Sequence, residues 1–158
     1  MFAVPPNTVA ADADRSLAHP VRIARELAAG RLSWAHRLRY DPQQRWAGLL
    51  ERTATHEAWL LSWLPGQRTE LHDHGGATGA FTVVSGNVTE RVVRDTPAGP
   101  VEEWHALETG QSRVFGPDHV HQVINDSPDP AITIHVYRPG RTQMTLYSLD
   151  PVDGLTRA

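Results

Sequence analysis

The sequence predicts an all-β fold, either a β-sandwich or a small β-barrel, with helical structure confined to the N-terminal quarter. After Thr55, short apolar or alternating runs rich in Val, Thr, Tyr and Trp recur at even spacing. Turn-forming pairs such as Pro65-Gly66 and Gly86-Asn87 separate the runs. Many short strands with turn residues between them are typical of sandwiches and small barrels.

The predicted elements follow in chain order. Residues 1–11 are small and apolar and contain two prolines, which predicts a poorly ordered tail. Pro20 and Gly30 stand where they would begin and end a helix, and the apolar stripe between them predicts a helix over 20–29. The pattern of residues 31–44 does not distinguish between types of secondary structure. The segment from Arg45 fits a strand as well as it fits a helix. The predicted strands are 57–64, 68–74, 79–85, 88–94, 101–107, 112–116, 119–124, 131–137 and 143–149.

Length and charge narrow the classes of function. The chain has 158 residues, 15 Lys and Arg against 18 Asp and Glu, and a formal net charge of −3. A chain this close to neutral offers no electrostatic footprint for nucleic acid and no polybasic face for a membrane. The first residues lack the features of a signal peptide, and no stretch approaches about 18 apolar residues. We therefore expect a cytoplasmic protein with no nucleic-acid or membrane partner.

Nine histidines and no cysteine are the most unusual feature of the composition. The absence of cysteine excludes disulfides, cysteine-ligated metal centres and a cysteine nucleophile. Metal chemistry would therefore have to use histidine and carboxylate ligands. Six of the nine histidines fall between positions 72 and 135, inside the predicted β region.

Three pairs of polar side chains in this region have a spacing of two residues. They are His72-x-His74, His119-x-His121 and His135-x-Tyr137. Because the side-chain period of a strand is two, each pair is expected to project from one face of its strand. Two imidazoles on one face can chelate a metal, and a third from a neighbouring strand can complete the set. The alternative, that surface hairpins carry scattered histidines, becomes weak when three pairs occur together.

Glycines, prolines and an asparagine at fixed spacings frame the histidines. Pro65-Gly66 is followed by five residues, His72-x-His74, four residues, Gly79, six residues and Gly86. The second block runs from Gly110 through five residues to Gly116, then to His121 and, four positions later, Asn125. The two blocks resemble the motifs of the cupin superfamily. The segments 63–66, 71–76, 79–86 and 133–139 are, more specifically, similar to bacterial cysteine dioxygenases, and the match spans roughly residues 45–149.

This resemblance implies a cupin-type small β-barrel (jelly roll) with a short N-terminal helical segment. We expect one structural domain overall, in which a tail and helical segment over 1–44 packs on a cupin β-barrel over 45–158. By the same resemblance, His72, His74 and His121 would bind a non-haem Fe(II). His121 is preferred to His119 because only His121 has an asparagine four residues later, but His119 shares its strand face and could lie beside the site.

The motif lacks the acidic ligand that most cupins supply after three or four further residues, where this chain has Thr78 and Gly79. Three neutral imidazoles leave the full divalent charge on the metal, which favours an anionic ligand such as a thiolate. This agrees with the family's reaction, in which a thiol and O2 give a sulfinic acid. We therefore expect an enzyme, an Fe(II) thiol dioxygenase acting on cysteine or a similar small thiol carboxylate.

Thr133, His135 and Tyr137 alternate along one predicted strand and resemble the family's hydroxyl–imidazole–phenol relay. They would then be catalytic residues, with Tyr137 directed at the substrate; the alternative is an ordinary half-buried strand. Gly79 occupies the position at which animal enzymes carry the cysteine that is crosslinked to the tyrosine, so no such thioether can form here. The bond Arg138–Pro139 corresponds to a cis X–Pro bond of the family.

One departure leaves the substrate open. Relatives that use free cysteine carry an arginine roughly 25 residues before the first ligand, and here that count falls on Ala47 and Gly48, between Arg45 and Arg52. Either the register differs, or another cation acts, or the substrate is 3-mercaptopropionate or mercaptosuccinate. The other candidate cations are Arg68, Arg113, Arg138 and Arg141.

Two other interpretations of the chain remain. It could be a non-catalytic cupin that binds a small molecule, or a three-histidine site that uses zinc, nickel or manganese in non-oxidative chemistry. As partners we expect a small thiol and O2, and as assembly state a monomer or weak homodimer.

Overall fold

A computed structural model describes residues 18–140 and 144–158, and β-strands dominate it. The helical elements are α2 (Pro20–Ala29) and the short 3-10 turns η1 (Arg31–Ser33) and η2 (Ala35–Arg37). The strands are β1 (Trp46–Arg52), β2 (Glu57–Trp63), β3 (Thr78–Ser85), β4 (Val88–Thr96), β5 (Gly99–Leu107), β6 (Ser112–Phe115), β7 (Val120–Ile124), β8 (Ala131–Arg138), β9 (Tyr147–Asp150) and β10 (Gly154–Arg157). The predicted helix over 20–29 and the predicted β-rich remainder are confirmed.

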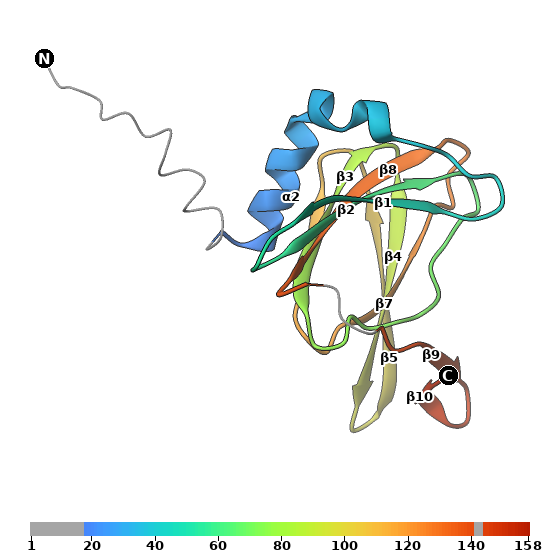
Figure 1. Cartoon of the computed structure of the whole chain (residues 1–158). Helices are drawn as coiled ribbons and strands as arrows, with labels where there is room; N and C mark the ends of the chain where they lie inside the picture. The colour runs from blue at the N-terminus through green and yellow to red at the C-terminus, as the bar shows by residue number, and fades with distance from the viewer. Residues whose placement is uncertain (1–17, 141–143) are drawn as a thin grey trace, which may run out of the picture.

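The strands form two main antiparallel sheets and a hairpin. The larger sheet has the order β1-β2-β8-β3-β6, the smaller β5-β4-β7, and β9 pairs with β10. In Figure 1, α2 lies against the outside of the larger sheet, and the β9–β10 hairpin lies at the other end of the molecule, near β5. Buried side chains of both sheets, among them Trp63, Phe81, Val88 and Val123, meet in one core between them.

Strand β8 is buried on both faces and separates the helix from the interior. Its residues Ile132, Ile134 and Val136 pack with the buried face of α2. The alternating residues Thr133, His135 and Tyr137 are also buried and point the other way, between the sheets. The period of two therefore gives the polar residues of β8 an interior position.

The segment 68–74, predicted as a strand, is not one. It makes only isolated bridges, from Arg68 to Ile124 and from His72 to His121 and to Leu146. Thr69 interrupts the ladder because its hydroxyl, rather than a main-chain carbonyl, accepts a bond from the Val123 amide (3.0 Å). The segment therefore runs along the edge of β7 as irregular extended chain.

Other differences lie at the ends of the chain. The ambiguous segment from Arg45 becomes strand β1, and β10 was not predicted. The predicted tail over 1–11 lies outside the described residues. Within the described residues, no helix is long and apolar enough to cross a membrane. The bond Arg138–Pro139 is cis, as the resemblance implied.

Candidate metal centre

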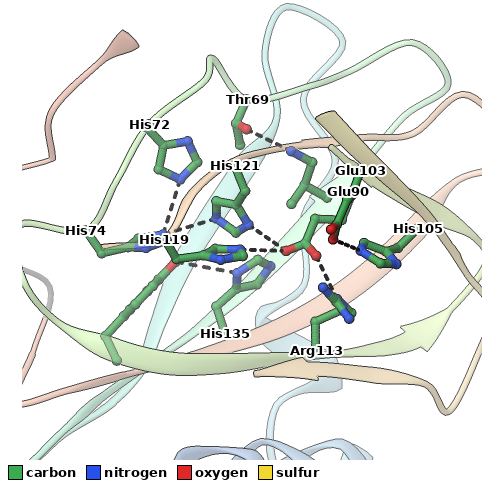
Figure 2. A network of polar contacts seen from close by, with 12 residues as sticks. Thr69, His72, His74, Glu90, Glu103, His105, Arg113, His119, His121 and His135 are labelled. Carbon is green, nitrogen blue, oxygen red and sulfur yellow. Dashed lines mark hydrogen bonds and ion pairs between the residues drawn. The ribbon is translucent and has the colours of Figure 1, made fainter. Parts of the chain in front are cut away.

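Three buried histidines from two segments converge in the interior (Figure 2). His72 and His74 lie on the irregular segment before β3, and His121 lies on β7. The main chains of His72 and His121 exchange two hydrogen bonds, each 3.0 Å, which brings the two segments together. The Nε2 atom of His74 then lies 3.2 Å from that of His72 and 3.3 Å from that of His121.

Neighbouring groups turn the Nε2 atoms toward one another. The Nδ1 of His72 donates to the main-chain carbonyl of Glu70 (2.7 Å), and the Nδ1 of His121 donates to a carboxylate oxygen of Glu90 (2.7 Å). Because these acceptors carry no proton, the hydrogen of each neutral imidazole is on Nδ1 and the lone pair is on Nε2. The ring of His74 stacks on Phe115 with centroids 4.5 Å apart.

This arrangement fits a metal ion. Nitrogens bound to one ion at about 2.1 Å lie about 3.0–3.4 Å apart at octahedral or tetrahedral angles, and the separations of 3.2 and 3.3 Å fall in that range. Burial lowers the pKa of His72 from 6.5 to about 3. Burial also lowers the pKa values of His74 and His121. All three are then neutral near pH 7, which is the form that binds metals. The structure therefore brings together a histidine trio that could hold a metal ion.

The Thr-His-Tyr stripe of β8 lies beside this trio as a chain of polar contacts. The indole of Trp63 donates to the Thr133 hydroxyl (2.9 Å), which lies 2.8 Å from Nε2 of His135. On the other side of the ring, Nδ1 of His135 lies 3.4 Å from the Tyr137 hydroxyl. Phe81 stacks on His135 with centroids 4.9 Å apart. Burial lowers the pKa of His135 well below its usual value, so this ring too is neutral.

A cavity joins these two groups to the surface. The inner cavity, of about 20 Å³, is lined by residues of both groups, including His72, His121, His135 and Tyr137. An outer cavity of about 760 Å³ adjoins it, and five residues line both. The shared residues are Arg45, Ala47, Thr69, His72 and Met144. A ligand of several heavy atoms would therefore extend from the inner cavity into the outer one.

Arg45, one of the two arginines that flank the counted position, lies at these cavities. It immediately precedes β1 and lines both cavities together with Ala47. The count fell on Ala47 and Gly48. Arg45 is two residues before Ala47, and this spacing keeps the same face because the side-chain period of a strand is two. Arg68 lines only the outer cavity of these two, and the guanidinium of Arg113 bonds to Glu90. Arg141 lies outside the described residues.

Sequence reasoning missed the buried carboxylate of Glu90. It projects from β4, is fully buried, and contacts His119, His121 and Arg113 (Figure 2). Burial alone would raise the pKa of Glu90, but the hydrogen bonds from these neighbours hold it well below its usual value. A signal was present, because Glu90 interrupts the apolar positions Val88 and Val92 of one strand face. His119 lies beside the trio rather than in it, with its Nε2 3.2 Å from Glu90.

Comparisons with known proteins agree with this picture. Residues 11–150 match the family model described as cysteine dioxygenase type I. The protein TT1209 from Thermus thermophilus is 24% identical, with a TM-score of 0.58 over 67% of this chain and 93% of that one. A Klebsiella pneumoniae protein with a double-stranded β-helix domain is 22% identical, with a TM-score of 0.57 over 71% of this chain and 91% of that one. An oxalate oxidase with a bound glycolate is 15% identical, with a TM-score of 0.58 over 67% of this chain and 56% of that one. The structural similarities confirm the cupin-type jelly-roll fold, although the sheets do not close into a continuous barrel.

Proposed function

The chain belongs to the cysteine dioxygenase type I family, and on that basis we propose that it is an Fe(II)-dependent dioxygenase that converts a small thiol carboxylate to the sulfinic acid. One observation carries the proposal: the histidine trio, the His135–Tyr137 pair and the Arg45 side chain all line a single cavity or contact residues that line it. The reaction R–SH + O2 → R–SO2H is balanced without a further reductant. Both oxygen atoms pass to sulfur, which supplies all four electrons.

In this proposal His72, His74 and His121 hold the metal through Nε2. When bound, ferrous iron would supply a redox-active centre that accepts a thiolate and lowers the pKa of the substrate thiol. An all-imidazole donor set adds no negative charge, so the residues themselves favour an anionic substrate group at the site. The narrow inner cavity supports a small reacting group there, with the rest of the substrate directed outward.

Arg45 is the residue we assign to the substrate carboxylate. Its side chain lines the inner and the outer cavity, so a thiol near the trio and a carboxylate near the guanidinium can belong to one short molecule. A guanidinium forms two parallel hydrogen bonds with a carboxylate, which gives orientation as well as affinity. The guanidinium carbon also lies over the ring of Trp63, 5.7 Å from its centre, and this cation–π contact helps to hold the guanidinium in place.

Tyr137 is the residue we assign to proton control at the reacting end. The Trp63 indole can only donate, so the Thr133 hydroxyl accepts from it and can donate to Nε2 of His135. The single proton of the neutral His135 ring is then on Nδ1 and directed to the Tyr137 oxygen. In that arrangement Tyr137 can turn its own O–H toward a ligand in the cavity. No cysteine is available for a crosslink, so this role belongs to an unmodified phenol.

The test combines metal binding with product analysis. The protein is loaded with Fe(II) without air, then given O2 and one of three thiols: cysteine, 3-mercaptopropionate or mercaptosuccinate. We expect O2 uptake and a sulfinate with at least one of them, with both product oxygens labelled when 18O2 is used. His72→Ala should lose iron and activity, whereas His36→Ala, which removes an exposed histidine, should lose neither.

Two outcomes would contradict the proposal. The first is an iron-loaded protein that consumes no O2 with any of the three thiols. The second is a purified protein that retains zinc, nickel or manganese and cannot be exchanged to iron. Either result would favour a binding or non-oxidative role for the same three-histidine site.

A further inference from the structure

The sequence motif has no carboxylate where most cupins carry an acidic metal ligand, yet a fully buried carboxylate lies one hydrogen bond away from the trio. We propose that Glu90 is a positioning residue for the metal ligand His121, one that supplies from outside the ligand set the negative charge that the set lacks. The inference rests on the proposed metal site, but it does not require a particular metal or reaction.

The contact between Glu90 and His121 is short and excluded from solvent. Oε2 of Glu90 lies 2.7 Å from Nδ1 of His121, and the exposed fractions of the two residues are 0% and 1%. The register of β4 and β7 explains the approach, because His121 is directly opposite Val92, and Glu90 is two residues before Val92 on the same face. A charge-assisted bond in such a setting is about twice as strong as a neutral one. The bond therefore sets the tautomer of His121 and aims its Nε2 at the two other histidines.

The site itself contains a comparison. His72 makes the same kind of Nδ1 bond at the same distance, 2.7 Å, but to the neutral main-chain carbonyl of Glu70. Orientation alone can thus be achieved here with a carbonyl. The carboxylate on His121 adds charge, which raises the basicity of the imidazole and offsets part of the charge of a bound divalent ion.

Two further groups hold the carboxylate in place. Arg113 donates through Nε to Oε1 of Glu90 (2.7 Å), and Nε2 of His119 lies 3.2 Å from Oε2. His119 in turn stacks on Phe115, whose ring also stacks on His74. Arg113 thus binds Glu90 and does not line either cavity, and His119 helps to hold the carboxylate in position. The same network therefore constrains His121 through charge and His74 through ring stacking.

The experiment measures metal binding without relying on catalysis. Co(II) affinity is determined by competition with a chromophoric chelator for the wild type and for Glu90→Gln, which keeps the volume and one acceptor oxygen but removes the charge. The matched control is Glu102→Gln, which removes a carboxylate from the neighbouring strand β5, where it pairs with Arg91. Thermal unfolding of the metal-free proteins reports whether each variant is folded.

We expect Glu90→Gln to bind Co(II) about 10- to 100-fold more weakly, and Glu102→Gln to bind like the wild type. In the Zn(II)-loaded wild type, the Nδ1 proton of His121 should give a downfield NMR signal that exchanges slowly with water. That signal should move upfield in Glu90→Gln and stay in place in Glu102→Gln.

The proposal is overturned if Glu90→Gln folds and binds Co(II) within about twofold of the wild type. If that variant does not fold, the NMR spectrum of the Zn(II)-loaded wild type tests the proposal instead. A zinc-bound His121 that carries no proton on Nδ1 would contradict the proposed bond to Glu90. A wild type that binds no Co(II) also overturns it. A wild type that binds Co(II) as expected but oxidises no thiol with iron would contradict the proposed function alone.

Discussion

Replacing Gly79 with alanine should destabilise the protein, because no space exists for one additional carbon at this position. Gly79 lies on β3 between Phe115 on β6 and Tyr137 on β8. A Cβ atom there would lie 2.4 Å from the main-chain oxygen of Val136 and 2.6 Å from Cζ of Phe115. Non-bonded carbon atoms normally pack at about 3.5–4.0 Å. The methyl group therefore forces both neighbours to move.

The size of the effect follows from which neighbours must move. Overpacking a core typically costs about 1–3 kcal/mol. The Val136 oxygen belongs to β8, which pairs with both β2 and β3 and therefore cannot shift alone. We expect the free energy of unfolding to fall by the upper end of that range, about 3 kcal/mol. For a chain of this size, that loss lowers the Tm by about 6–12 °C. The ring of Phe115 stacks on His74, so its displacement should also weaken metal binding.

The assay is thermal and urea unfolding of the metal-free protein, with Gly116→Ala as the control. A Cβ at Gly116 meets no atom within 4 Å, so this variant should unfold like the wild type. Overpacking requires a loss of several degrees. A Gly79→Ala protein that unfolds within about 1 °C of the wild type would therefore show that the added methyl group causes no strain at this position. Gly79→Cys meets the same obstruction, so intact-mass analysis should find no thioether to Tyr137.

Three other predictions concern the site. Tyr137→Phe should retain iron and lose about 100-fold in turnover, because it lacks the phenolic proton; loss of iron would contradict its assigned role. Arg45→Met should raise the KM for thiol carboxylates about 10- to 100-fold, and an equal rise for thiols without a carboxylate would contradict the assignment. Burial holds the pKa of His72 at about 3 against 6.5 in the unfolded chain. Stability of the metal-free protein should therefore be full above pH 6.5 and fall by up to about 1.4 kcal/mol per pH unit for each such histidine at lower pH. Urea midpoints that do not change between about pH 7.5 and about pH 5 would contradict this.

Local patterns were sufficient for most of the secondary structure. Turn residues between apolar runs predicted β2 to β8 within about two residues at each end, and Pro20 and Gly30 predicted the bounds of α2. The alternation along β8 placed Thr133, His135 and Tyr137 on one face, where they form a hydrogen-bonded chain. These features were predictable because the side-chain period of a strand and the φ preferences of glycine and proline act over a few neighbouring residues.

The segment 68–74 shows the limit of such patterns. Its residue types suit a strand, but Thr69 and Gln122 use their side chains in place of ladder bonds to the facing chain. Whether these side chains replace main-chain bonds depends on contacts between Thr69 and β7, more than 50 residues away in the sequence. The same partner strand brings His72 and His121 together through main-chain bonds, which spacing alone could not show.

By itself, the sequence was enough to identify the family-type motifs, the absence of an acidic ligand in the usual place and the impossibility of a cysteine crosslink. It preferred His121 to His119 as a ligand but left open whether His119 acts beside the site. It also left several arginines as candidates for the cation of the cavity and gave Glu90 no role. Those questions depend on which side chains meet across separate strands. The register between strands and the packing of two sheets set those distances, and neither is encoded in the spacing of residues along one strand.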